Sequence, residues 1–369
     1  MRFVYFTHSL RSCWNHGNAH FLRGVLRELL ARGHDVRSFE PRDAWSSTDL
    51  RTDQGEAALT QFAEAYPDLA PHSAYLQPDI DAMLAGAEVV LMHEWNDPAL
   101  VAAVGARRKR GGRFLLLFHD THHRAVSDPE AIRRLDLSGY DGVLAFGATL
   151  ADVYRRAGWG WRAFVWHEAA DTRRFRPPSE QQSRSGLVWI GNWGDEERSD
   201  ELRSYLVEPA ASLNIPLDIY GARYPDHARA LLAANGARYC GWVANAAVPE
   251  VFASHLMTVH VPRRCYVRQL PGIPTIRVFG ALACGIPLIC APWHDMEALF
   301  QPGCDYLEAR SPSQMVDHMR ALQADGALRQ SLAAHGLDTI RTRHTCAHRV
   351  DQLLGILRCL SNAQQKAAA

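Results

Sequence analysis

A loop rich in proline and glycine leads directly into a short apolar helix in the second half of the chain. The stretch is PGIPTIRVFGALACG (271–285), and Thr275 suits the cap position of a helix over 276–284. The first N–H groups of a helix have no partners within it, so residues 276–278 suit an anion. Arg277 lies in this first turn, where a cation opposes the helix dipole unless an anion lies beside it. We therefore expect Thr275, Ile276 and Arg277 to face a phosphate-like group, with a solvated arginine as the alternative.

A second candidate loop, IGNWG, follows the apolar stretch GLVWI at 186–190. Gly191 and Gly194 flank Asn192 and Trp193, and glycine lets a ligand approach the backbone closely. A plain turn is the alternative interpretation.

Histidines and carboxylates gather after an apolar stretch in the first half, in FHDTHHRAVSD (118–128). General acid–base chemistry needs one such group at a binding site, which makes His119 and Asp120 candidates. A metal site is not expected, because the spacing matches no common ligand pattern and the adjacent His122 and His123 should point apart. Structural histidines are the alternative.

Two further loops of the first half end in polar side chains. THSLRSCWNHGN (7–18) supplies His8, His16 and Asn18, and MHEWNDP (92–98) supplies His93 and Glu94. A metal cluster of His8, Cys13, His16 and His20 is disfavoured by the change from loop to helix. We expect these side chains to line the same site as the 118–128 loop.

Elements that position these loops alternate between strand and helix throughout the chain. Apolar stretches predict strands at 2–6, 34–39, 87–92, 113–118, 141–146, 161–166, 186–190, 216–220, 256–261 and 287–290. Amphipathic helices separate them, so each half is expected to be a parallel sheet covered on both faces. The fold class is therefore α/β, with two doubly wound, Rossmann-like domains facing a cleft.

Domain boundaries follow from where this alternation stops. We expect an N-terminal domain over 1–170, a polar linker with Pro177-Pro178 over 171–185, and a C-terminal domain over 186–345. An amphipathic helix over 346–362 and a tail over 363–369 complete the chain.

Composition excludes several classes of protein. Lys+Arg and Asp+Glu are both 40, so the zero net charge gives no reason to expect nucleic-acid binding. No apolar run approaches a membrane span, and MRFVYFTHSL reads as a strand rather than a signal peptide. The eight cysteines form no C-x-x-C pair, which favours a reducing, cytoplasmic location.

Taken together, these stretches resemble the GT-B glycosyltransferases of the group-one type, and more narrowly their CgeB-like (spore maturation protein) branch. The motifs that carry the resemblance span nearly the whole chain: LLARGHDV (29–36), HEWNDP (93–98), FHDTHHRAV (118–126), WHEAADTRRFRP (166–177), IGNWGDEER (190–198), PGIPTIRVFGALACGIPLICAPW (271–293) and RHTCAHRVDQLL (343–354).

The resemblance implies a GT-B fold and a hexosyltransferase-type activity. The second domain would bind a nucleotide-sugar donor, the first would bind an acceptor of unknown identity, and the last helix would pack back on the first domain. Transfer would need no metal and no cofactor, because the helix start and basic side chains replace a divalent ion on the diphosphate. The broader grouping suggests retention of configuration, and inversion stays open.

Carried over residue by residue, the resemblance assigns three sets of side chains. The donor set is Gly191, Asn192, Arg223, Arg263, Arg264, Thr275, Ile276 and Arg277. The acceptor side is Gly17, Asn18, His93, Glu94, His122 and His123, and the catalytic candidates are Asp120, His119 and His16.

One position departs from the family pattern. The family commonly has a glutamate that contacts the donor ribose where this chain has Gly280. Its absence implies weaker donor binding, a different partner such as Asp295 or Glu297, or lost activity. A GT-B-shaped sugar-nucleotide epimerase and a weakened nucleotide-sugar-binding protein without turnover therefore remain alternatives to a transferase.

Overall fold

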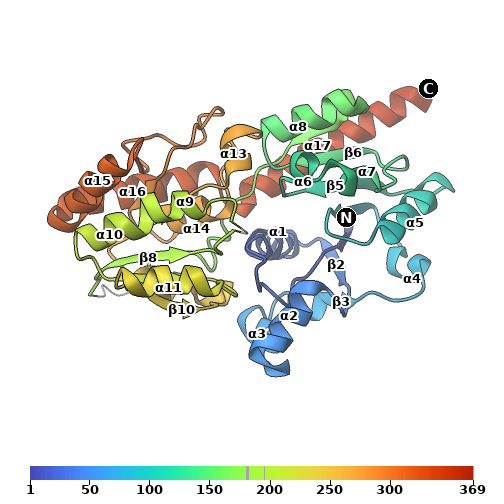
Figure 1. Ribbon diagram of the computed structural model, residues 1–369. Helices are drawn as coiled ribbons and strands as arrows, with labels where there is room; N and C mark the ends of the chain where they lie inside the picture. Colours follow the sequence, from blue (N-terminus) through green and yellow to red (C-terminus); the bar gives the residue numbers. More distant parts are fainter. Residues whose placement is uncertain (180–182, 195, 369) are drawn as a thin grey trace. The chain divides into compact units, whose positions relative to one another are not determined.

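The computed structural model describes residues 1–179, 183–194 and 196–368 (Figure 1). The chain divides into two compact units, one formed by Met1–Glu168 with the segment from Cys346 onward, and one by Ala169–Thr345. Described residues of the predicted linker, 171–179 and 183–185, belong to the second unit. Residues 180–182 of that linker lie outside the described residues.

Within its described residues the first unit contains a parallel sheet in the order β3-β2-β1-β4-β5-β6-β7. The strands are β1 (Arg2–Phe6), β2 (Asp35–Glu40), β3 (Ser73–Tyr75), β4 (Val89–His93), β5 (Leu115–Asp120), β6 (Gly142–Ala145) and β7 (Ala163–Val165). The central strands are buried along their length, which explains their continuous apolar sequences. The sequence did not predict β3, which pairs with β2 through three residues only.

Helices of the first unit connect these strands. They are α1 (Ala19–Ala31), α2 (Trp45–Gln54), α3 (Gln61–Ala65), α4 (Ile80–Leu84), α5 (Pro98–Lys109), α6 (Arg124–Ser127), α7 (Pro129–Arg133), α8 (Ala148–Tyr154) and α17 (Cys346–Ala368), with the short turns η1 (Glu56–Leu59), η2 (Ala70–His72), η3 (Arg155–Trp159) and η4 (Gly160–Arg162). The chain thus alternates strand and helix, as the sequence predicted.

The C-terminal helix α17 packs against α1 and closes the first unit. Arg32 at the end of α1 donates to the Ala347 carbonyl at 3.1 Å and forms an ion pair with Asp351. The indole N–H of Trp166 donates to the Arg349 carbonyl at 2.8 Å. The helix continues to Ala368, so the residues from 363 that the sequence suggested as a tail are helical up to that point.

The described residues of the second unit contain a parallel sheet in the order β10-β9-β8-β11-β12-β13. The strands are β8 (Leu187–Ile190), β9 (Leu217–Tyr220), β10 (Arg238–Gly241), β11 (Met257–His260), β12 (Leu288–Cys290) and β13 (Leu307–Glu308). The helices are α9 (Ser199–Leu202), α10 (Glu208–Ser212), α11 (Asp226–Ala234), α12 (Val248–Ala253), α13 (Arg264–Arg268), α14 (Ile276–Ala283), α15 (Pro312–Ala324) and α16 (Gly326–Arg343), with the turns η5 (Arg203–Val207) and η6 (Asn245–Ala247).

Both sheets reverse their direction of growth at an inner strand pair, β1/β4 in the first unit and β8/β11 in the second. This confirms the predicted class of two doubly wound parallel α/β domains. At such a reversal the loops after the two strands diverge, which opens a binding site at the carboxyl ends of the strands. Predicted site residues end or follow β1, β4 and β5 in the first unit and β8, β9 and β11 in the second. Within the described residues, no helix is long and apolar enough to cross a lipid bilayer.

Candidate functional site

The start of α14 keeps its capacity to bind an anion. Thr275 lies at the cap position with extended backbone, but its side chain caps no N–H of the helix. Instead its hydroxyl pairs with Nε2 of His260 at 3.3 Å. The first-turn amide of Ile276 has no carbonyl partner within the helix, since the residue four positions earlier lies outside it. The predicted geometry of Thr275 and Ile276 is therefore present.

Arg277 turns back across the end of β8. Its Nε donates to the Ile190 carbonyl at 2.8 Å, and its guanidinium lies 5.2 Å from the centre of the Trp189 ring. A Cβ at Gly191 would lie 2.7 Å from Nη2 of Arg277. The structure thus brings together Gly191 and Arg277, which the sequence analysis had selected separately, and explains why position 191 is a glycine.

A second guanidinium, that of Arg198, packs at the same place. Its side chain is buried, lies 5.2 Å from the centre of the Trp189 ring, and donates to the carbonyls of Val261 at 3.1 Å and Asn192 at 2.6 Å. Gly194, at φ +94, makes room, because a Cβ there would lie 2.8 Å from Nε of Arg198. Sequence reasoning missed Arg198, since nothing distinguishes it within the charged run DEERSD.

Arg198 and Arg277 together create a positive potential beside Trp189. Among the described residues, Arg198 forms no ion pair, and its buried Nε atom has no hydrogen-bond partner. Burial and the charges of Arg277 and Arg263 lower the pKa of Arg198 well below its usual value. The same burial, with Arg277 and Arg198, lowers the pKa of His260 to about 3, so its ring is neutral. An anion bound here would relieve the repulsion between the two guanidinium groups.

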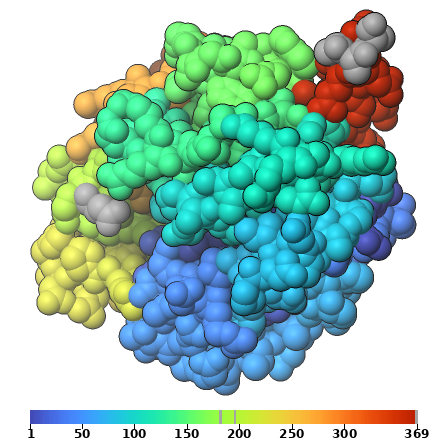
Figure 2. Space-filling model, turned by 90° about the vertical axis from the view of Figure 1, so that its right-hand side faces the viewer, coloured from blue at the N-terminus to red at the C-terminus, as the bar shows by residue number. Residues whose placement is uncertain are grey.

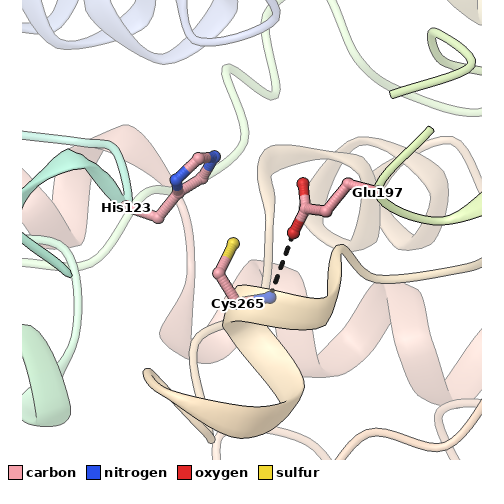
Figure 3. A group of neighbouring side chains, drawn as sticks. All are labelled: His123, Glu197 and Cys265. Atoms are coloured by element: carbon pink, nitrogen blue, oxygen red, sulfur yellow. Dashed lines mark hydrogen bonds between the residues drawn. The ribbon is translucent and has the colours of Figure 1, made fainter. Parts of the chain in front are cut away.

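Arg263 and Arg264, also predicted to reach a ligand, are neutralised by neighbouring carboxylates. Arg263 pairs with Glu197 at 3.0 Å, and Arg264 forms two bonds to the Glu201 carboxylate at 2.8 and 3.0 Å. Figure 3 shows Glu197 also accepting the backbone N–H of Cys265, at 3.2 Å. These arginines secure the segment before α13 to the segment around α9, which reduces the charge they offer to a ligand.

Asn192 and Arg223 lie at the tips of two neighbouring loops. The side-chain oxygen of Asn192 accepts the backbone N–H of Ala222 at 2.9 Å, which ties the loop after β8 to the loop after β9. Arg223 is exposed and has a left-handed backbone at φ +44. Asn192 therefore positions these loops, and Arg223 lies exposed at their surface.

In the first unit, two buried carboxyl groups follow β4 and β5. Glu94 accepts bonds from Arg124 at 2.9 and 2.6 Å, and Asp120 accepts the Tyr154 hydroxyl at 2.6 Å and the His122 backbone N–H at 3.0 Å. Burial raises the pKa of both carboxyl groups, and the charge of Asp120 raises that of Glu94 further. The Arg124 guanidinium opposes these shifts and lies 3.9 Å from the centre of the Trp95 ring.

Thr121 connects two of the predicted acceptor-side residues, His93 and Asn18, beside the catalytic candidate His16. Its hydroxyl contacts Nε2 of His93 at 3.0 Å and accepts Nδ2 of Asn18 at 2.8 Å, and the rings of His16 and His93 lie 6.0 Å apart. His16 and His93 are buried, and burial lowers the pKa of each well below its usual value. Gly17 lies exposed beside them. The structure therefore gathers these residues at one edge of the sheet, as expected.

His119 neighbours this group, since its ring lies 5.7 Å from that of His93. Its ring contacts the Tyr5 hydroxyl and lies 4.7 Å from the Trp166 ring, and it is fully buried. Burial lowers its pKa to about 3. These surroundings are those of a core histidine, which was the alternative interpretation in the sequence analysis.

The expectation that His122 and His123 point apart was wrong. Their rings lie 3.9 Å apart at an angle of 33°, because the chain at this point is an irregular turn before α6 rather than a strand or helix. Nδ1 of His123 contacts the Ser127 hydroxyl at 2.7 Å, and His122 lies 5.2 Å from the Trp95 ring.

Comparison with known proteins adds a family model and several structures. The model described as "Glycosyl transferase-like" matches residues 198–355. No curated protein matches the sequence. Among solved structures, sucrose-phosphate synthase from Thermosynechococcus elongatus is 14% identical, with a TM-score of 0.68 and coverage of 98% of this chain and 100% of that one.

Two further structures match over nearly their whole length. A glycosyltransferase from Rickettsia africae ESF-5 is 9% identical, with a TM-score of 0.67 and coverage of 97% of this chain and 98% of that chain. HepE from Anabaena, solved with UDP and glucose, is 11% identical, with a TM-score of 0.66 and coverage of 97% and 99%. The chain therefore has the GT-B glycosyltransferase fold, as the sequence predicted.

Proposed function

We propose that this protein is a glycosyltransferase that moves a sugar from a nucleotide-sugar donor to an acceptor hydroxyl group. The observation that carries this proposal is the pair of guanidinium groups, Arg198 and Arg277, on one tryptophan beside the start of α14. A diphosphate carries the negative charge and the acceptor oxygens that guanidinium groups and helix N–H groups bind well. HepE was solved with UDP and glucose, so UDP is the first nucleotide to test.

In the proposed reaction, the bond between the sugar and the diphosphate breaks and negative charge develops on the departing phosphate. The first-turn N–H groups of α14 and the guanidinium of Arg277 would stabilise that charge. Because Arg198 and Arg277 together bring two positive charges, we propose that transfer requires no divalent metal and no cofactor. Gly191 would let the diphosphate approach the Arg277 side chain closely.

The acceptor would bind to the first unit. Asp120 is our candidate for the base, because burial raises its pKa to about 6 and so toward the working range of a general base. His119 and His16 are weaker candidates, since burial lowers the pKa of both rings and leaves them poor proton acceptors near neutral pH. Asn18, His93 and Glu94 would orient the acceptor from the same edge of the sheet.

Of the two carboxylates named as alternatives for the glutamate missing at Gly280, Asp295 and Glu297, we propose Asp295. One oxygen of this carboxylate accepts the Phe300 backbone N–H at 2.8 Å, while the other is buried and, among the described residues, has no hydrogen-bond partner. Burial raises the pKa of Asp295. We propose that its second oxygen accepts a ribose hydroxyl. This would make the alternative of a weakened binding protein unnecessary.

Membership of the CgeB-like branch and a cytoplasmic location are further parts of the proposal. The first rests on the motifs quoted from the sequence and the second on the cysteine spacing. Both are secondary to the donor site.

The test is calorimetric titration with UDP, GDP, dTDP, ADP and CDP, each in the presence of Mg²⁺ or EDTA. One nucleoside diphosphate that binds equally well in EDTA supports the donor site and identifies the base. Failure of all five to bind argues against a transferase. Release of nucleoside diphosphate from the sugar nucleotide only when an acceptor is present separates a transferase from an epimerase.

A further inference from the structure

An exposed tryptophan marks a surface of the first unit that the proposed reaction does not use. Trp161 is 56% exposed and lies in RRAGWGWR (155–162), the segment of η3 and η4 that precedes β7. Gly158 and Gly160 have left-handed backbones, and a Cβ at either would meet no atom within 4 Å. The turn therefore projects into open space and exposes a large amphipathic ring.

The same segment is anchored at its base. Nη2 of Arg155 donates to the Ala163 carbonyl at 3.1 Å, and the Arg162 guanidinium lies 4.9 Å from the centre of the Trp159 ring. The turn is therefore attached to the start of β7 rather than loose, which lowers the entropy cost of holding Trp161 at a surface.

A second, strongly basic segment accompanies it. ARRKRGGR (106–113), at the end of α5, has five cations and no acid, and RRAGWGWR has three cations and no acid. Lys109, Arg110 and Arg113 are exposed. Arg107, Arg108 and Arg155 pair with Asp81, Asp141 and Asp152, so the charge that this surface offers comes mainly from Lys109, Arg110 and Arg113.

The two segments lie at one edge of the sheet. They precede β5 and β7, the two neighbours of β6, so both meet the amino end of that strand. The loop before β6 touches both, because Nζ of Lys109 contacts the Ser138 hydroxyl at 2.6 Å and Nη1 of Arg162 donates to the Tyr140 carbonyl at 3.5 Å. In Figure 2 the teal surface of α5, the green surface above it and the red end of α17 belong to one visible face.

We propose that this surface, residues 106–113 and 155–162, attaches the protein to a lipid bilayer that contains anionic lipids. Tryptophan prefers the interface between headgroups and acyl chains, where an exposed indole buries its ring and keeps its N–H in contact with water. Each lysine or arginine near an anionic leaflet adds attraction, and a few apolar and basic contacts together give reversible attachment. A projecting tryptophan turn suits shallow insertion into lipid.

The experiment is sedimentation of the full-length protein with vesicles of phosphatidylcholine alone or with 30% phosphatidylglycerol. We expect binding to the anionic vesicles that falls with added salt, and little binding to the neutral ones. The double variant Arg110→Gln/Arg113→Gln should weaken binding roughly 25-fold, at about five-fold per charge. Trp161→Ala should weaken it roughly ten-fold through lost apolar contact.

Matched controls come from the second unit. Met296 is also 56% exposed, so Met296→Ala removes a similarly exposed apolar side chain, and the double variant Arg229→Gln/Arg310→Gln removes two exposed charges. Neither control should change vesicle binding by more than two-fold. Equal binding to both vesicle types, no binding at all, or equal effects of variants and controls would each overturn the proposal. So would tighter binding to a DNA duplex than to anionic vesicles in the same buffer.

Discussion

Replacement of Arg277 by glutamine should weaken nucleoside diphosphate binding while leaving the fold intact. The guanidinium is only partly buried, and its structural hydrogen bond at 2.8 Å goes to a backbone carbonyl, which a glutamine amide can also satisfy. A hydrogen bond between ionic partners contributes about 1.5–3 kcal/mol. The expected increase in Kd is therefore roughly 10- to 150-fold.

Arg264→Gln is the matched control, because this arginine lies in the same unit and was also predicted from the sequence to contact the donor. Its two hydrogen bonds to Glu201 already compensate its charge, so the Kd should change less than about three-fold. The assay is titration calorimetry with the nucleotide that binds the unmodified protein best. Thermal unfolding curves would show that each variant remains folded.

A second variant tests the same geometry without removing a charge. Gly191→Ala places a methyl group where the Arg277 guanidinium lies, within 2.7 Å of Nη2, so the side chain must move away from its position. The loss of affinity should approach that of Arg277→Gln. If Arg277→Gln binds normally, or if Arg264→Gln loses as much affinity, the anion site at the start of α14 is wrong.

Three other predictions concern burial and charge. Burial lowers the pKa of His119 to about 3, so below about pH 6.5 the folded protein binds fewer protons at this ring than the unfolded chain does. The free energy of unfolding should therefore fall as the pH drops below about 6.5. In the variant His119→Phe, the urea midpoint should depend less steeply on pH. Asp295→Asn should weaken binding of a nucleoside diphosphate about ten-fold but leave inorganic pyrophosphate binding unchanged; equal losses would exclude a ribose contact. Arg124→Gln leaves the Glu94 carboxylate buried without its cation, so the free energy of unfolding measured in urea should fall by about 3–5 kcal/mol at high pH. The loss should be smaller at low pH, where that carboxyl is protonated. In the control variant Arg133→Gln, which removes an exposed partner, the loss should be under about 1 kcal/mol.

Local patterns in the sequence determined the architecture of this protein. The central strands are continuous apolar runs and the helices between them are amphipathic, and these features are set by neighbours in sequence. The same holds for the start of α14. The prolines and the glycine of residues 271–274 keep that segment out of the helix, and Thr275 occupies the cap position. Short edge strands such as β3 and β13 were not predictable, because two or three residues carry no periodic signal.

Which charged side chains are available to a ligand was decided only by the tertiary structure. Arg263 and Arg264 follow the central strand β11, and the sequence alone makes them as plausible as Arg277 for contacting a ligand. In the structure, however, Arg263 and Arg264 each pair with a carboxylate from a segment more than 60 residues earlier. Arg198 looked like one charge among many, and only the fold places it on Trp189 beside Arg277. Local sequence indicates which residues end a strand. Which charged side chains pair with one another depends on how loops that are distant in sequence meet in the fold, and that long-range geometry leaves no local pattern.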